Sequence, residues 1–247
     1  MEFLANLNWV AVGQIILIDI LLGGDNAIVI ALACRNLPPK MRTRGILWGT
    51  FGAVGIRIVL IAFAVTLLNL PYIKMIGGLL LLWIGIKLLS DDDSHGDIAG
   101  SDRLLAAVKT IIVADLVMSV DNVLAVASAA SQAAGEHQFL LVVFGILVSI
   151  PIIIWGSTLV LRLMERFPII ITLGAALLGY LAGGMIFTDT AVSPWLIANL
   201  PIANDFVVPG LGMHMSLPGV VLAIVVVVAG TYLARRKQAA AASQSHS

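Results

Sequence analysis

Two copies of one polar motif lie inside long apolar stretches of the chain. The first copy, "DILLGGDNAIVIALA", begins at Asp19, and the second, "DLVMSVDNVLAVASA", begins at Asp115. The candidate ligands are the aspartates and asparagines of both copies: Asp19, Asp25, Asn26, Asp115, Asp121 and Asn122. Carboxylate and amide oxygens suit hard divalent cations such as magnesium, calcium and manganese. Because a carboxylate inside a membrane is costly, the motif predicts a functional cation site.

Three further residues can take part in this site. Arg57 lies inside an apolar stretch, where it can act as a counter-ion or gate partner for the aspartates. Ser119 adds a hydroxyl, and Met118 offers a soft thioether ligand that would favour manganese over calcium. No histidine or cysteine lies near the middle of an apolar stretch, which disfavours zinc and copper. In the plainer alternative, the aspartates only pair with Arg57 and stabilise interrupted helices.

The charges of this cluster favour a cation. Four ionised aspartates and Arg57 sum to −3, and a bound divalent cation would leave −1. Close buried carboxylates cannot all stay ionised, so the site without its cation should take up protons. Competition between a metal ion and protons for one site is what antiport requires.

The elements that hold these residues are predicted to be membrane-spanning helices. The chain has 247 residues, of which 60% are hydrophobic and 11% charged, and its mean hydropathy is +1.05. Seven stretches offer the roughly 20 apolar residues that a spanning helix needs. They are 9–33, 45–68, 72–89, 105–131, 138–161, 168–187 and 216–234. The zero net charge gives no indication of a nucleic-acid partner, and one cysteine cannot form an intrachain disulfide.

The two halves of the chain align at a constant offset of 96 residues, which places Asp19 on Asp115. Three spans are an odd number, so the second half must enter the membrane inverted. The sequence therefore predicts an all-α polytopic membrane protein, with one transmembrane domain over 1–247 built from an inverted 3+3 repeat plus one C-terminal helix. Its parts are repeat one (9–89), an acidic cytosolic linker (90–104), repeat two (105–187), an external loop (188–215), a seventh helix (216–234) and a disordered cytosolic tail (235–247). Many secondary transporters share this plan, with substrate bound near the midplane.

Glycines and basic residues add two local predictions. The pair Gly23-Gly24 predicts an interruption of the helix just before Asp25, whereas the Gly-x3-Gly pairs at 45/49 and 179/183 predict close helix packing. Twelve of the 14 lysines and arginines fall on one face of the predicted topology. By the positive-inside rule, the amino end is expected outside and the carboxyl end in the cytosol.

The two motif copies resemble the paired signatures of the TerC family of integral membrane proteins. The Ser-x-Asp-Asn core of the second copy resembles the general family pattern, and Gly-Gly-Asp-Asn-Ala in the first resembles the YjbE-type subgroup. The resemblance covers about residues 9–235. It implies manganese export across the bacterial inner membrane, a historical link to tellurium-ion resistance, a fold like that of LysE-type exporters, and the six motif residues as the metal pathway. Many family members have glutamate at the position of Asp19.

Residues and resemblance together predict a secondary transporter that exports manganese by proton antiport. No P-loop sequence is present, and each charge moved against 100 mV costs about 2.3 kcal/mol, so exchange for protons is the simplest drive. A calcium, broader metal or organic-solute exporter stays open, as does a non-transporting scaffold in metal or tellurite stress. We expect no enzymatic activity and no tightly bound cofactor, since manganese would be a substrate. The expected partners are the lipid bilayer, the cation and protons, and a homo-oligomer stays open.

Overall fold

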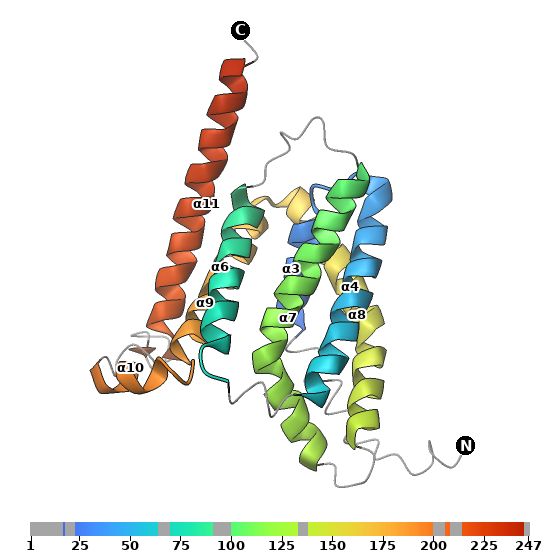
Figure 1. The fold of residues 1–247 in the computed structure, drawn as a ribbon. Coiled ribbons are helices and arrows are strands. Elements are labelled where there is room, and N and C mark those ends of the chain that lie inside the picture. The colour runs from blue at the N-terminus through green and yellow to red at the C-terminus, as the bar shows by residue number, and fades with distance from the viewer. Residues whose placement is uncertain are drawn as a thin grey trace. The chain divides into compact units, whose positions relative to one another are not determined.

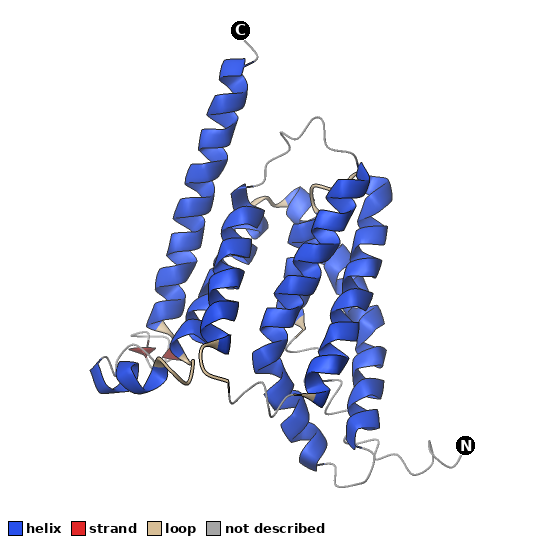
Figure 2. Cartoon of the chain, viewed as in Figure 1, coloured by secondary structure: helices blue, strands red, loops and turns tan. Residues whose placement is uncertain are grey.

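The computed structural model describes residues 17, 23–63, 70–90, 100–132, 138–199, 206–207 and 214–244, and for 62, 121–132, 138–142, 206–207, 214–215 and 241–244 it describes the backbone alone. Apart from turns and loops, the described part is helical except for one short pair of strands (Figure 2). The helices are α3 (Gly24–Cys34), α4 (Pro39–Ala62), α6 (Ile73–Ser90), α7 (Gly100–Gln132), α8 (Gln138–Arg166), α9 (Ile169–Phe187), α10 (Ser193–Asn199) and α11 (Leu217–Gln244). Strand β1 (Phe206–Val207) pairs antiparallel with β2 (His214–Met215).

Within the described residues, five helices are long and apolar enough to cross a membrane. They are Pro39–Ile61, Ile73–Ser90, Val143–Arg166, Ile169–Phe187 and Leu217–Ala240. The expectation of a polytopic, helical membrane protein is therefore confirmed. Helix α7 also covers the predicted stretch 105–131. The first predicted span, 9–33, lies mostly outside the described residues, and α3 is the part of it that is described as a helix.

Proline positions explain where some helices begin and how they continue. Helix α4 begins at Pro39, where a missing backbone N–H costs no helical hydrogen bond. The turn before it is held by Arg42, whose guanidinium donates hydrogen bonds to the carbonyls of Arg35 and Leu37, both at 3.0 Å. Helix α8 continues through Pro151, which membrane helices tolerate better than helices in water.

Three predicted non-helical segments contain helices or strands in the structure, which corrects their bounds or content. The tail 235–247 was expected to be disordered, but α11 continues to Gln244. Its added residues are mostly alanine, lysine, arginine and glutamine, which are strong helix formers, and Lys237 Nζ donates to Ser90 O at 3.3 Å. The linker 90–104 is shorter than predicted, because α6 includes Ser90 and α7 begins at Gly100. The loop 188–215 contains α10 and both strands.

The chain divides into two compact units. Unit 1 comprises Met1–Leu67 and Leu104–Arg162, and therefore holds α3, α4 and most of α7 and α8. Unit 2 comprises Leu68–Arg103 and Leu163–Ser247, and holds α6, α9, α10 and α11. Each predicted repeat thus places its third helix in unit 2, together with the helix that has no counterpart in the repeat.

In unit 2, α9 packs against both α6 and α11 (Figure 1). A Cβ atom on Gly179 would lie 2.6 Å from the carbonyl oxygen of Leu222, and one on Gly183 would lie 2.6 Å from Gly219 Cα. The backbones of α9 and α11 therefore approach closely, and the predicted role of this Gly-x3-Gly pair in helix packing is confirmed.

In unit 1, the other Gly-x3-Gly pair has the same role. A Cβ on Gly45 would lie 2.9 Å from the sulfur of Cys34, the chain's one thiol, which is fully buried. A Cβ on Gly49 would lie 2.5 Å from the side chain of Ile111. Helix α4 is thereby held close to α3 and α7, and most of the buried polar residues described in unit 1 lie on these helices.

Candidate cation site

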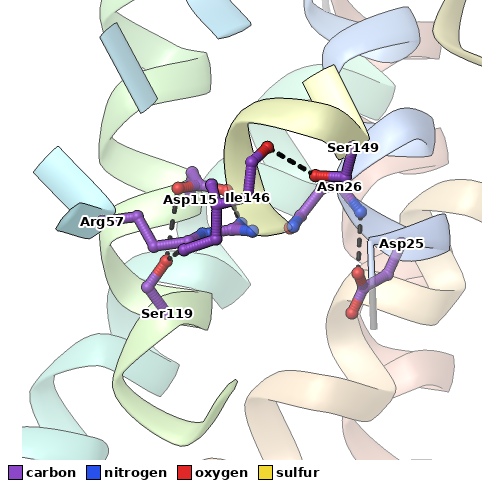
Figure 3. A network of polar contacts seen from close by, with 7 residues as sticks. All are labelled: Asp25, Asn26, Arg57, Asp115, Ser119, Ile146 and Ser149. Atoms are coloured by element: carbon purple, nitrogen blue, oxygen red, sulfur yellow. Dashed lines mark hydrogen bonds and ion pairs between the residues drawn. The ribbon is translucent and has the colours of Figure 1, made fainter. Parts of the chain in front are cut away.

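A closed triangle of polar contacts joins α4 to α7. Arg57, Asp115 and Ser119 have exposed fractions of 3%, 6% and 0%. Arg57 Nη2 forms an ion pair with Asp115 Oδ1, and Arg57 Nε donates to Ser119 Oγ at 3.1 Å. Ser119 Oγ in turn donates to Asp115 Oδ2 at 3.2 Å (Figure 3). Both carboxylate oxygens of Asp115 therefore already accept a hydrogen bond.

The helices position this triangle through two regular features. Asp115 and Ser119 are four residues apart on α7, so their side chains share one face of the helix. A Cβ on Gly52 would lie 2.5 Å from the side chain of Ile112, so α4 lies directly against α7. Arg57 follows little more than one turn after Gly52, which brings its guanidinium to the level of Asp115.

The first motif copy lies where a helix begins. Gly23 is the N-cap of α3, and Asp25 occupies the first turn. The backbone N–H of Asn26 donates to Asp25 Oδ1 at 2.7 Å, and a negative charge at this end is favoured by the helix dipole. A helix that begins here agrees with the interruption predicted from Gly23-Gly24. The second copy differs, because α7 runs without a break past Ser119.

Asn26 is the unusual member of the first copy. Its side chain is 4% exposed, and neither Nδ2 nor Oδ1 has a hydrogen-bond partner within the described part of the chain. Buried amides are nearly always hydrogen-bonded, so an unpartnered one needs an explanation. Figure 3 draws Asn26 between Asp25 and the Arg57–Asp115–Ser119 triangle, near Ser149 of α8, whose hydroxyl donates to Ile146 O at 2.8 Å.

These residues form one electrostatic group. The carboxylate of Asp25, which is partly buried, feels the charges of both Arg57 and Asp115. With all three ionised, their charges sum to −1. The group therefore still attracts a cation after Arg57 has neutralised Asp115.

The predicted site residues fall into three sets. The structure brings together Asp25, Asn26, Asp115, Arg57 and Ser119, and it buries Met118 on the same helix as Asp115. Asp19 lies outside the described residues, and the side chains of Asp121 and Asn122 do too. Among the described residues, no three histidine, cysteine or acidic side chains gather as a metal-binding group.

The sequence analysis missed several buried polar residues, of which Thr50 and Asp189 have the most unusual hydrogen bonding. Thr50 on α4 is fully covered, and its hydroxyl has no hydrogen-bond partner among the described residues. It lies seven residues before Arg57, a spacing that places both on one face of α4 and that could have identified it. The second missed residue, Asp189, lies in unit 2.

Asp189 is a carboxylate held by backbone groups. It is 0% exposed and accepts hydrogen bonds from the N–H groups of Tyr72, Lys74 and Met75, each at 3.1 Å, and of Ala191 at 2.8 Å. Burial acts to raise the pKa of Asp189, but these four hydrogen bonds outweigh it and lower the pKa below its ordinary value of 3.8. The carboxylate thus caps the N-terminus of α6, next to Tyr72 with its φ of 68°.

Comparison with known proteins assigns this chain to a family. Residues 4–238 match the family described as "Integral membrane protein TerC family". The chain belongs to the TerC family. The membrane protein YjbE of Bacillus subtilis is 47% identical over 176 residues, which cover 71% of this chain and 78% of YjbE. YceF of the same organism is 29% identical, with 57% of this chain and 56% of YceF covered.

A third relative, the inner membrane protein YgdQ of Escherichia coli K12, is 25% identical over 183 residues, which cover 65% of this chain and 73% of YgdQ. YjbE and YceF are both described as uncharacterized membrane proteins. No solved structure matches the chain. The resemblance of the two motif copies to the TerC family, with YjbE as a relative, is therefore confirmed.

Proposed function

We propose that this TerC family protein is a secondary transporter that exports divalent metal cations, with manganese as its main substrate, across the bacterial inner membrane in exchange for protons. The observation that carries the proposal is the buried side-chain amide of Asn26, which has no hydrogen-bond partner among the described residues. It lies next to the carboxylate of Asp25, whose charge interacts with those of the buried pair Arg57–Asp115. Buried ionisable residues in membrane helices characteristically mark substrate pathways.

The chemistry of the group fits a hard divalent cation. Its donors are two carboxylates and one amide, while the hydroxyl of Ser119 is held between Arg57 and Asp115, and no described residue adds an imidazole or thiolate to them. All of these donors are oxygens of the kind that manganese, magnesium and calcium take. The other motif residues, Asp19, Asp121 and Asn122, are proposed to complete the pathway, and the thioether of Met118 would favour manganese.

The proposed architecture is the LysE-like plan of seven spans, with an inverted 3+3 repeat. The helix bounds support the offset of 96 residues, because Ile73–Ser90 of α6 shifted by 96 becomes 169–186, and α9 is Ile169–Phe187. The division of each repeat between the two units supports it as well. The distribution of basic residues places the amino end outside and the carboxyl end in the cytosol.

Manganese flux in proteoliposomes tests the proposal. Wild type, Asp25→Asn and Asp102→Asn would be compared with and without an imposed pH gradient. Asp102 is an exposed aspartate near the start of α7, so Asp102→Asn makes the same chemical change outside the site. We expect flux driven by the gradient in wild type and Asp102→Asn. In Asp25→Asn, flux should fall by about tenfold or more, as happens when even a supporting group of a metal site is removed.

Other results would contradict specific parts of the proposal. Calcium flux in place of manganese flux would replace the substrate and keep the site. Equal flux in wild type and Asp25→Asn would place the pathway elsewhere. No flux in wild type, with the protein correctly folded, would favour a scaffold.

A further inference from the structure

We propose that Arg57 is a tethered cation, which pairs with Asp115 when the site holds no cargo and is displaced when a divalent cation binds. The inference rests on the proposed function, and it adds the means by which a strongly acidic site releases its cargo. Arg57 acts here as a positioning residue, through Asp115, and is not itself a ligand.

The first step is that both carboxylate oxygens of Asp115 have a side-chain partner in the structure. Its Oδ1 is paired with the guanidinium of Arg57, and its Oδ2 accepts from Ser119 Oγ. Ser119 also accepts from Arg57 Nε at 3.1 Å, so one hydroxyl holds the cation and the carboxylate together. A cation that bound Asp115 would therefore share its carboxylate with these contacts and compete with Arg57 for its negative charge.

The second step is the contrast with the neighbouring residues. The amide of Asn26 is buried without a hydrogen-bond partner among the described residues, and beside it lies the carboxylate of Asp25. Asp25 feels the charge of Arg57. A divalent cation on Asp25 and Asn26 would therefore be repelled by the guanidinium for as long as it remained on Asp115.

The third step is that arginine suits this exchange. Its guanidinium stays charged at any physiological pH, and its flexible stem on α4 lets it leave Asp115 and return. Transport requires binding that is favourable enough for entry and weak enough for release. A tethered charge that competes for Asp115 weakens binding in this way and takes the place of the cargo after release.

A static ion pair is the plainer reading of the same contacts, and it makes the opposite prediction. A buried ion pair is weak evidence for stability, since replacing both partners is often tolerated. If the pair only held α4 against α7, removing Arg57 would disturb the site and weaken cation binding. If Arg57 competes with the cargo, removing its charge strengthens cation binding.

The test is Mn²⁺ binding to the full-length protein in nanodiscs, read from the loss of the electron paramagnetic resonance signal of aqueous Mn²⁺, together with flux in proteoliposomes. For Arg57→Gln we expect tighter Mn²⁺ binding, within the roughly 5-fold to 150-fold range of coupled equilibria. Its flux should show a lower KM and a lower maximal rate, since release becomes slow. Arg57→Lys keeps a tethered charge and should remain near wild type.

Ser119→Ala keeps the inference testable if Arg57→Gln does not fold. Without the hydroxyl that holds Arg57 to Asp115, Mn²⁺ should again bind more tightly. Weaker or unchanged binding in a folded Arg57→Gln, or weaker binding in Ser119→Ala, would overturn the inference while wild-type flux upheld the proposed function. Wild type that neither binds nor transports Mn²⁺ would overturn both.

Discussion

Asp115 in unit 1 and Asp189 in unit 2 are both buried carboxylates, but their partners are of different kinds. Asp115 is satisfied by the side chains of Arg57 and Ser119, whereas Asp189 is satisfied by four backbone N–H groups. Side chains can rotate away and exchange for another partner. Backbone groups at the start of a helix can do so only if the helix itself unwinds.

The comparison teaches how to separate a functional buried charge from a structural one. The partners of Asp115 come from two helices, and the neighbouring amide of Asn26 adds a donor and an acceptor that have no partner among the described residues. Asp189 has a complete set of fixed donors at one helix end. We therefore assign Asp115 to the proposed transport cycle and Asp189 to the stability of unit 2.

The largest expected effect is that of Asp115→Asn, which leaves Arg57 buried without its carboxylate. We expect a loss of about 3–5 kcal/mol in the free energy of unfolding, the usual cost of breaking a buried pair from one side. The measurement is unfolding in detergent, followed by circular dichroism. The double variant Asp115→Asn with Arg57→Gln should recover most of the stability and still lack manganese flux. Restored flux in the double variant would remove Asp115 from the transport cycle.

Asp189→Asn is expected to have a smaller effect, on stability alone. The amide keeps the size of the side chain. It presents one oxygen acceptor to the four N–H donors, whereas the carboxylate presents two. We expect a loss of about 2 kcal/mol, which for a chain of this length lowers the melting temperature by roughly 4–8 °C. Manganese flux per folded molecule should match wild type. A selective loss of flux in fully folded Asp189→Asn would contradict the division between the two aspartates.

The lowered pKa of Asp189 gives a pH dependence of known sign. A carboxyl whose pKa is lower in the folded state stabilises the protein above the unfolded value of 3.8, and this contribution is lost as the pH falls through the folded pKa. The difference in melting temperature between wild type and Asp189→Asn should be constant above about pH 5 and should shrink in more acidic buffers. A difference that did not change down to the lowest pH at which the proteins fold would show that the charge of Asp189 has no part in the cap.

The smallest expected effect concerns Tyr72, whose N–H is one of the four donors. Its φ of 68° lies in the left-handed region, which side chains with a Cβ disfavour. Tyr72→Gly should relieve this strain and raise stability by no more than about 1 kcal/mol, partly offset by the greater freedom of glycine in the unfolded chain. Thermal unfolding next to a Tyr232→Gly control, at an exposed residue inside α11, would measure it. A loss as large as in the control would show that the backbone at Tyr72 is unstrained.

Hydropathy predicted the bounds of a helix best where the whole helix consists of apolar residues. For α6 and α9 the predicted bounds differ from the observed ones by at most one residue. Helix α4 begins six residues before the predicted 45, because the helix is set by Pro39 and continues through charged residues that hydropathy excludes. The extension of α11 to Gln244 was missed for the same reason, since polar helix formers look like a solvated tail.

The sequence predicted those parts of the site that depend on residue type and on spacing within one helix. The sequence singled out Asp115, Ser119 and Arg57, and both of its interpretations, a counter-ion in the site and a purely structural partner, expected Arg57 to pair with an aspartate. The role of Asp189 could not be predicted, because three of its donors lie 114 to 117 residues away along the chain. The Asn26 amide, which has no partner in the described part of the chain, likewise depends on which helices surround it.

The burial of Cys34 has a practical consequence for spectroscopy. The chain has one thiol, and it is enclosed where α3 meets Gly45 of α4. Thiol-reactive probes in gentle detergent should therefore find almost nothing to modify in the folded wild type. New cysteines at exposed positions within either unit can carry fluorophores or spin labels without prior replacement of the native one. The folded wild-type protein therefore offers no reactive native thiol that would compete with an introduced cysteine for the label.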